Sequence, residues 1–396
     1  MMKFRTRSRA RSVGVSSAIV FLLAGGVAAC SSDADGDSPG GDAPGGGSEP
    51  VASDELDLSA LDVSDEVAEE LQSLYQEALE EGTFTSYAGH QEELAPLYAA
   101  YEEAFPGITV NPVTTIGADS LAKLEGERAS GNHVADIYSS PNIETYLEFA
   151  QPYEVVAFTP PEGIEGVAPE QLVGTGENEH MYAAGQIFLI GTARNTELVE
   201  DADAPRTWAD MVDPAWDGQT VFDDPSRPGG ANGAVTQLLN AGIIDTQWMN
   251  DLGDGATITA SQQLAGQQLS AGQAALEIFL STSTVLAMQN TGAPVAFNFL
   301  DENNIMLTNK YMLVDNAPNP AAAKLFLNFI HTKPAQEAIL ESGDYPLNQA
   351  TDVTSPHGFP RLDELHILEL APNSVLVPLG GQNSDMYREE FFVELD

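Results

Sequence analysis

Large apolar residues recur along the chain at two spacings, which predict helices and strands in alternation. At 91–105 every third or fourth residue is apolar, so we expect a helix that ends at Pro106-Gly107. The same pattern predicts helices at 120–129 and 321–330, and short apolar runs predict strands at 108–110, 134–138, 186–190, 220–222, 274–280 and 305–314. This alternation indicates the α/β class, with mostly parallel sheets flanked by helices.

The first 29 residues have the pattern of an export signal. Five basic residues precede the apolar stretch 13–27, which is short for a membrane span. The stretch ends in Val27-Ala28-Ala29-Cys30, which resembles the lipobox of bacterial lipoproteins, and Cys30 is the only cysteine of the chain. The resemblance implies cleavage before Cys30, its lipidation, and anchoring to the extracytoplasmic face of the cell membrane. A cysteine buried in a core is the alternative.

Residues 30–60 have the composition of a flexible tether. They are rich in Gly, Ser and Asp and contain few large apolar residues. Asp33, Asp35 and Asp37 imitate the start of a calcium-binding loop, but Ser38 stands at the position of the loop's glycine and Pro44 at that of its glutamate. A solvated linker is therefore the preferred interpretation.

The charge of the chain excludes one class of function. There are 60 acidic and 15 basic side chains, which gives a formal net charge of −45. Binding to a phosphate backbone needs a basic patch, so a nucleic-acid partner is not expected. The large negative charge has two interpretations: it keeps the surface soluble in salt, or its electrostatic field concentrates cationic solutes near the protein. We favour the first because the acidic residues are spread along the chain and salt screens their charge.

Several short motifs occur in the order found in one family. They are Leu74 to Gly82, Phe105-Pro106-Gly107-Ile108, Ala135-Asp136-Ile137-Tyr138, Thr207-Trp208-Ala209-Asp210, Asp213-Pro214-Ala215-Trp216, Asp224-Pro225-Ser226 and Gly343 to Asn348. Together they resemble the extracellular solute-binding proteins of ABC importers, in the ferric-ion branch of the type II periplasmic binding proteins. The resemblance implies a two-lobed clamshell with a two-strand hinge, which closes on a small solute and presents it to a membrane permease.

On this resemblance, residues 61–190 and 304–396 form the first lobe and 191–303 the second. The tail 349–396 could pack on either lobe, and the crossovers near 187–195 and 297–304 would act as the hinge. Binding without chemical change is expected, so the protein is not predicted to be an enzyme. No cofactor is implied, and the expected partners are the solute, the permease subunits and the membrane through the lipid; a monomer is expected.

The ferric ligands of the family are not reproduced. The family's adjacent tyrosines correspond to a position in Ser281 to Thr284, its glutamate falls near Pro141, and His90 lies one residue early for its histidine. Neutral hydroxyls are poor ligands for Fe(III), so no metal ligand is assigned here. Iron, bare or chelated, remains an alternative solute.

Loops that precede helices supply the candidate binding residues, because helix N-termini offer unpaired N–H groups and a partial positive charge. Arg227 could clamp a carboxylate or phosphate, or could pair with Asp223 or Asp224 at the surface. Tyr87 and Tyr138 stand at predicted strand ends. The predicted solute is small and polar or anionic, and its expected contacts are Tyr87, Gly89, His90, Gly117, Asp119, Ser120, Tyr138, Ser139, Ser140, Ser226, Arg227, Gly229, Gly230, Thr282 and Ser283.

Two other functions are compatible with the sequence. Ser120-Leu121-Ala122-Lys123 matches the S-x-x-K motif of serine acyl-enzymes, but the companion motifs S-D-N and K-T-G do not occur. A structural or adhesive surface protein would have no cleft and no ligand-dependent stability. Neither alternative explains the ordered motifs, so solute binding is preferred.

Overall fold

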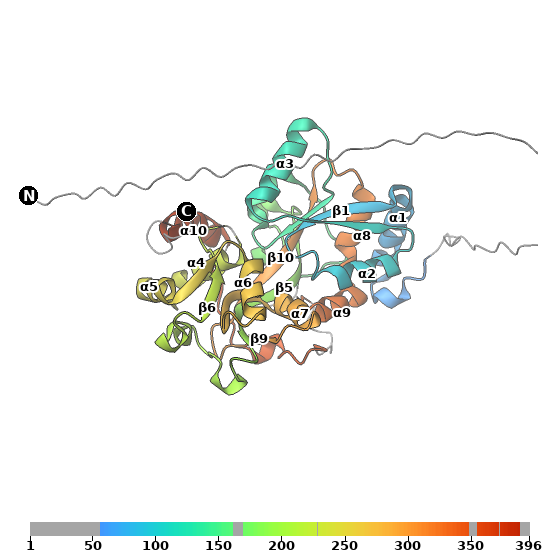
Figure 1. Ribbon diagram of the computed structural model, residues 1–396. Helices are drawn as coiled ribbons and strands as arrows, with labels where there is room; N and C mark the ends of the chain where they lie inside the picture. Colours follow the sequence, from blue (N-terminus) through green and yellow to red (C-terminus); the bar gives the residue numbers. More distant parts are fainter. Residues whose placement is uncertain (1–55, 161–168, 228, 348–354, 372, 389–396) are drawn as a thin grey trace, which may run out of the picture. The chain divides into compact units, whose positions relative to one another are not determined.

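The computed structural model describes residues 56–160, 169–227, 229–347, 355–371 and 373–388 (Figure 1). The signal peptide, Cys30 and most of the tether lie outside the described residues. The helices are α1 (Asp65–Glu81), α2 (Ala95–Ala104), α3 (Ala118–Ser130), α4 (Gly230–Asn240), α5 (Thr246–Gly255), α6 (Gln262–Ser270), α7 (Thr282–Asn290), α8 (Pro320–Phe329), α9 (Lys333–Glu341) and α10 (Asn373–Met386).

The strands form one sheet in which parallel and antiparallel parts are separated. The strands are β1 (Thr83–Ala88), β2 (Thr109–Thr114), β3 (Ile137–Ser140), β4 (Ala150–Gln151), β5 (Ala183–Asn195), β6 (Thr220–Asp223), β7 (Ala256–Thr259), β8 (Leu276–Ser281), β9 (Val295–Asn298), β10 (Ile305–Val314) and β11 (Tyr345–Pro346). Their order is β2-β1-β3-β10-β5-β8-β6-β7, with β4, β9 and β11 beside this path. Helices alternate with these strands, so the predicted α/β class is confirmed.

Parallel pairing occurs at both ends of this order, and antiparallel pairing in its middle. β1 pairs in parallel with β2 and β3, and β6 pairs in parallel with β7 and β8. The long strands β5 and β10 are antiparallel to each other and to their neighbours. β10 joins β3 to β5, and β5 continues to β8, so these two strands connect the parallel parts.

Separate hydrophobic cores support the two parallel parts. The first core packs α1, α2 and α8 against β1, with Phe84, Tyr101 and Phe326 fully buried at its centre. Another core packs α4 and α5 near β6 and β8, around Phe222 and Met249. The loops between strands and helices begin and end at these packed layers.

Local signals explain where several helices begin. The Ser64 side chain accepts a hydrogen bond from the backbone N–H of Val67 and caps α1, and Thr332 precedes α9 with a proline in its first turn. The predicted strand 305–314 coincides with β10. The motif that begins at Thr207 contains only a short 3-10 helix, Ala209–Val212, because Pro214 follows closely.

The folded region begins before the expected end of the tether. The backbone N–H of Leu56 donates to the Gln72 side chain at 3.0 Å, and Leu56 and Leu58 pack on the first core. A 3-10 helix follows at Ser59–Leu61. Apolar residues at 56 and 58 thus tie down a segment that composition alone assigned to the tether.

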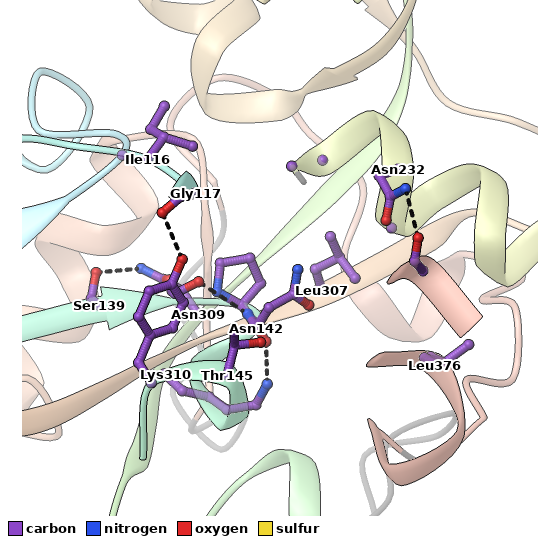
Figure 2. A pocket seen from close by; sticks show the side chains of 18 of the residues that line it. Ile116, Gly117, Ser139, Asn142, Thr145, Asn232, Leu307, Asn309, Lys310 and Leu376 are labelled. Carbon is purple, nitrogen blue, oxygen red and sulfur yellow. Dashed lines mark hydrogen bonds between the residues drawn. The ribbon is translucent and has the colours of Figure 1, made fainter. Parts of the chain in front are cut away.

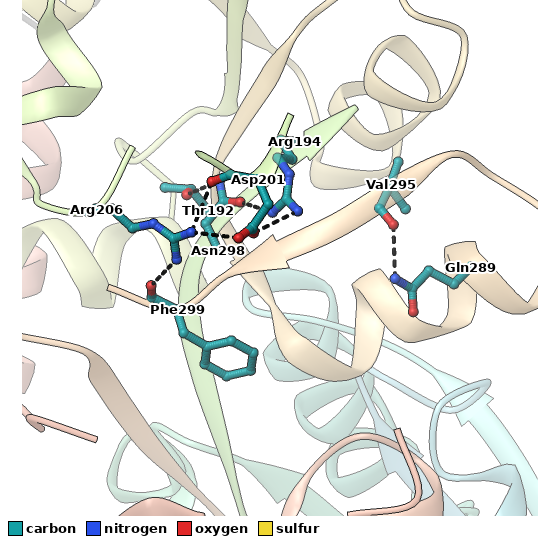
Figure 3. Close-up of polar contacts among 8 residues, drawn as sticks. All are labelled: Thr192, Arg194, Asp201, Arg206, Gln289, Val295, Asn298 and Phe299. Atoms are coloured by element: carbon teal, nitrogen blue, oxygen red, sulfur yellow. Dashed lines mark hydrogen bonds and ion pairs between the residues drawn. The ribbon is translucent and has the colours of Figure 1, made fainter. Parts of the chain in front are cut away.

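A cluster of charged side chains holds the carboxyl end of β5 in place (Figure 3). Arg194 donates to Asn298 at 2.6 Å and to Asp201 at 2.9 Å, and Arg206 donates to Asp201 at 3.0 Å. Burial lowers the pKa of Arg194, against the opposing effect of Asp201. The cluster fixes the segment after β5 to β9.

No helix in the described ranges is long and apolar enough to cross a membrane.

Candidate functional site

A cavity of about 440 Å³ lies among the ends of strands and the beginnings of helices (Figure 2). Its lining comes from the loop after β1, the start of α3, the end of β3, the 3-10 helix η2 (Ile143–Phe149), α4, β10 and α10. The lining residues are Gly89, His90, Thr115, Ile116, Gly117, Ala118, Leu121, Tyr138, Ser139, Ser140, Pro141, Asn142, Thr145, Tyr146, Gln171, Gly229, Gly230, Asn232, Gly233, Thr236, Gln237, Leu307, Thr308, Asn309, Lys310, Leu376, Gly380, Gly381 and Ser384.

Three consecutive polar residues of β10 reach this cavity. The Thr308 hydroxyl donates to the backbone oxygen of Gln171 at 3.0 Å, and the Asn309 amide donates to the Ser139 hydroxyl at 3.3 Å. Figure 2 shows Asn309 and Ser139 facing each other across neighbouring strands. The Asn309 contact therefore joins the middle of β10 to the end of β3 at one wall of the site.

Lys310 places a buried cation beside the cavity. Only 1% of the residue is exposed, and its ammonium donates to the backbone oxygen of Pro141 and lies 3.5 Å from a carboxylate oxygen of Glu144. Burial lowers the pKa of Lys310, while the neighbouring Glu144 opposes this change. Glu144 thus offsets much of the positive charge that a solute would meet.

Two helices begin at the cavity without a capping side chain. Gly117 precedes α3 and Gly229 precedes α4, and a glycine has no side chain with which to cap the first N–H groups. The Tyr146 hydroxyl donates to the backbone oxygen of Gly117 at 2.9 Å and so helps to hold the start of α3. The two helix starts can offer N–H groups and partial positive charge to an electron-rich solute.

Gln237 on α4 has a side-chain oxygen that accepts no hydrogen bond within the described part of the chain. Only 5% of the residue is exposed. Leaving such a buried acceptor unpaired costs about 1 to 3 kcal/mol. Because Gln237 lines the cavity, a hydroxyl or N–H group of a solute is a suitable partner.

His90 connects the cavity to a group of acids. Its Nδ1 atom lies 3.9 Å from a Glu93 oxygen, which also accepts a hydrogen bond from the Thr284 hydroxyl at 3.3 Å. Burial opposes protonation of His90, but Glu93 and Asp344 outweigh it and raise the pKa of His90. Burial also raises the pKa of Asp344 to about 7. The group links the loop after β1 to the start of α7.

The cavity brings together about half of the contacts predicted from sequence. Those in its lining are Gly89, His90, Gly117, Tyr138, Ser139, Ser140, Gly229 and Gly230. They come from distant parts of the sequence and meet because β3, α3 and α4 end or begin at the same place. Contact between these residues and a solute stays a prediction.

The other predicted contacts lie outside the lining, and several of them have local partners. Among them, Tyr87 donates to Glu127 at 2.7 Å, and the Ser120 hydroxyl donates to Thr115 at 3.2 Å. Asp119 is exposed in the first turn of α3. Arg227 pairs with Asp224 at 3.4 Å and half of its side chain is exposed, which matches the surface ion pair considered as its alternative.

Three further predicted contacts lie in the loop after β6 and in the first turn of α7. The Ser226 N–H donates to Asp224 at 2.9 Å. Ser283 is buried with its hydroxyl 3.3 Å from that of Ser281, and Thr282 is fully buried at the start of α7. None of these three residues lines the cavity.

Sequence reasoning missed the polar residues on β10, α4, η2 and α10. Thr308, Asn309 and Lys310 interrupt an otherwise apolar run, and that interruption is the signal by which they could have been found. Gln237 and Asn232 carry no comparable signal, because a single amide on an apolar helix is common. The described residues include no group of three or more His, Cys, Asp or Glu side chains arranged to hold a metal ion.

Solved structures share this fold at low sequence identity. Iron-bound HitA from Pseudomonas aeruginosa is 17% identical, with a TM-score of 0.58 over 76% of this chain and 99% of that chain. AfuA from Actinobacillus pleuropneumoniae with fructose-6-phosphate is 18% identical, with a TM-score of 0.61 over 78% of this chain and 98% of that chain. The ferric binding protein from Campylobacter jejuni is 15% identical, with a TM-score of 0.60 over 77% and 98%. The two-lobed periplasmic-binding-protein fold is confirmed.

A family model supplies the functional class. No match was found among curated protein sequences. The model of the bacterial extracellular solute-binding proteins matches residues 86–337, which include most of the cavity lining. Proteins of this kind deliver solutes to ABC permeases from outside the cytoplasm. The chain therefore belongs to the bacterial extracellular solute-binding protein family of ABC transporters.

Proposed function

We propose that the protein captures a small polar or anionic solute in the 440 Å³ cavity and hands it to an ABC permease without changing it. The observation that carries this proposal is the composition of the lining. It combines side-chain amides and hydroxyls with the uncapped starts of α3 and α4. Such groups hold solutes that carry several oxygen atoms, because they donate and accept hydrogen bonds in fixed directions.

The lobes follow the division expected from sequence in this proposal. Residues 61–190 and those after 304 form the first lobe, and 191–303 form the second. The cavity then has walls from both, with Gly117 and Ser139 on the first and Gly229 and Asn232 on the second. β5 and β10 connect the parallel parts of the sheet, which suits a two-strand hinge. A solute that touches both walls would favour the closed state.

Helix N-termini supply the main attraction for an anionic group in this account. Lys310 is buried, but its ammonium is shared by Pro141 and Glu144. A solute anion near it would also lie near the Glu144 carboxylate. The N–H groups at the starts of α3 and α4 have no such neighbouring carboxylate within their first residues, apart from exposed Asp119. Gln237 suits a hydroxyl group on the same solute.

Iron is the second candidate solute, since two of the similar structures are described as iron-bound or ferric-binding proteins. The cavity offers His90, Tyr138 and Tyr146 as possible ligands, but the stretch Ser281 to Thr284, where the family's tyrosine pair would stand, is outside the lining. Oxygen-rich Fe(III) sites use several charged ligands. The neutral amides and hydroxyls of this lining therefore favour an organic solute or a chelate over the bare ion.

Binding without catalysis also agrees with the position of Ser120 and Lys123. The Ser120 hydroxyl donates to Thr115, and the Lys123 ammonium lies over the Tyr87 ring, 5.6 Å from its centre. A lysine that activated the serine would have to bond to its hydroxyl. Lipid anchoring at Cys30 on the extracytoplasmic face, and a monomeric state, complete the proposal from the sequence pattern alone.

Thermal unfolding with a defined set of compounds tests this proposal. The set contains fructose-6-phosphate, inorganic phosphate, citrate, glucose, ferric citrate and ferric ion. A true solute stabilises the fold by about 2.7 kcal/mol at a hundredfold excess over its Kd. Stabilisation by organic members with hydroxyl or anionic groups supports the proposal. Stabilisation by ferric ion alone would assign the protein to iron capture instead.

A further inference from the structure

α10 forms one side of the cavity, although it lies beyond the stretch matched by the family model. Leu376, Gly380, Gly381 and Ser384 of α10 are in the lining, whereas the family match ends at residue 337. α10 packs along α4, and Figure 1 shows the two helices next to each other. α10 also contacts η2, which lines the cavity on the β3 side. The helix thus extends from one wall of the cavity to the other.

Specific hydrogen bonds hold α10 against α4. The Asn232 amide donates to the backbone oxygen of Gly380 at 3.3 Å and to the Ser384 hydroxyl at 3.1 Å. Figure 2 shows Asn232 pointing toward the neighbouring helix. One turn further, the hydroxyls of Thr236 and Tyr387 lie 3.3 Å apart, and Tyr387 is fully buried. Asn232 is therefore engaged by α10 and by Pro225, and is oriented by them beside the solute space.

Two adjacent glycines of α10 differ in what surrounds them. A Cβ atom on Gly380 would lie 2.8 Å from the Asn232 side-chain oxygen, so a side chain there displaces the Asn232 side chain that α10 holds. A Cβ atom on Gly381 meets nothing within 4 Å in the described structure, and Gly381 lines the cavity. Gly380 thus permits the close approach of the two helices, whereas Gly381 leaves space open to the solute.

We propose that α10 is a wall of the solute site that limits the size of the solute, with Gly380 docking the wall and Gly381 keeping the space in front of it open. The proposal rests on the function proposed above, because it describes the same cavity. A larger side chain at 381 fills space that the solute would use. Loss of the Asn232 contacts lets the wall move outward and admits larger molecules.

Thiol labelling measures this wall without any solute. The chain has one cysteine, so Cys30→Ser combined with Ser140→Cys leaves a single thiol in the cavity lining. Its labelling rate is measured with N-ethylmaleimide and with the larger pyrenyl maleimide, which are both uncharged. The ratio of the two rates reports the size limit and is insensitive to the protein's negative charge.

Four variants on this background test the proposal. Gly380→Ala raises the relative rate of the large reagent about tenfold, because docking weakens. Gly381→Trp lowers it about tenfold, because the indole fills the opening. Gly381→Ala and the exposed Gln382→Ala leave it within about twofold, since neither touches α4.

Two outcomes would overturn the proposal. Equal ratios in Gly380→Ala and Gly381→Ala would show that α10 is not docked through Gly380. An unchanged ratio in Gly381→Trp would show that α10 does not border the solute space, and this variant answers the question even if Gly380→Ala fails to fold. The labelling ratios can follow the expectation even if the cavity binds no solute. The labelling experiment and the thermal-unfolding experiment can therefore fail separately.

Discussion

The ammonium of Lys310 lies 3.5 Å from a carboxylate oxygen of Glu144 and joins β10 to η2 beside the cavity. The Lys310 side chain is 2% exposed and that of Glu144 18%. Removing one partner of a buried pair leaves the other charge poorly solvated. Removing one partner of this pair should therefore lower the free energy of unfolding more than removing one partner of a surface pair.

We expect Glu144→Gln to lower the free energy of unfolding by about 3 kcal/mol, because the Lys310 ammonium loses its carboxylate in a buried place. Urea unfolding measures the change. Glu148→Gln is the matched control: its partner Arg128 is at 3.0 Å, but both side chains are largely exposed. Its cost should stay below about 1 kcal/mol. Equal losses in the two variants would contradict the argument.

Buried acids predict that stability falls as pH rises through the neutral range. Burial raises the pKa of Asp344 to about 7 and that of Asp223 to about 6, from 3.8 in each case. The folded state therefore holds protons that the unfolded state has released, and this contribution is complete below pH 4 and lost by about pH 7. Burial of His331 lowers its pKa to about 3, so its own contribution is lost in the opposite direction, as pH falls.

Asp344→Asn isolates one of these groups. The variant should match the wild type near pH 4 and exceed it at pH 8, by at most about 4 kcal/mol for a shift of this size. Chemical unfolding at a series of pH values gives the comparison. Asp301→Asn, at an exposed site, should leave the pH profile unchanged. A steeper loss of stability at high pH in Asp344→Asn would contradict the predicted sign.

Gly185 on β5 is required by the packing of a neighbouring ring. A Cβ atom there would lie 2.6 Å from the Tyr311 ring and 2.9 Å from Ile330. Gly185→Ala should therefore destabilise the protein by about 1 to 3 kcal/mol, as measured by thermal unfolding. Gly126→Ala, inside α3 with no atom within 4 Å of the new Cβ, should instead stabilise it by about 1 kcal/mol. The same sign for both substitutions would refute this account of the site.

The sequence predicted the fold better than the site. Apolar spacing locates β10 at its observed bounds and α8 within one residue, because burial on both faces leaves a continuous apolar pattern. Gly117 and Gly229 were identified because glycine before a helix indicates an accessible N-terminus. Arg227 was placed in the site as one of few basic residues, in a loop that precedes a helix; it lies outside the lining and pairs with Asp224 at 3.4 Å.

The remaining site residues needed the tertiary structure. Thr308, Asn309 and Lys310 interrupt an apolar run, but this signal alone does not show that a cavity lies beside the strand. α10 contains Pro378 and two glycines, which disfavour a helix in sequence terms. Its packing on α4 stabilises the helix nevertheless, and the spacing of apolar residues in the sequence does not predict this contact.

Native mass spectrometry of the protein purified from its own host tests the central claim most directly, with the wild type compared with Gln237→Leu. We expect the wild type to retain a small organic solute. Gln237→Leu should lose most of it, because an unmade hydrogen bond of about 1.4 kcal/mol weakens binding about tenfold. Gln247→Leu, at an exposed position on α5, should retain it like the wild type. A solute held equally by all three proteins, or a protein that carries none, would contradict capture in this cavity.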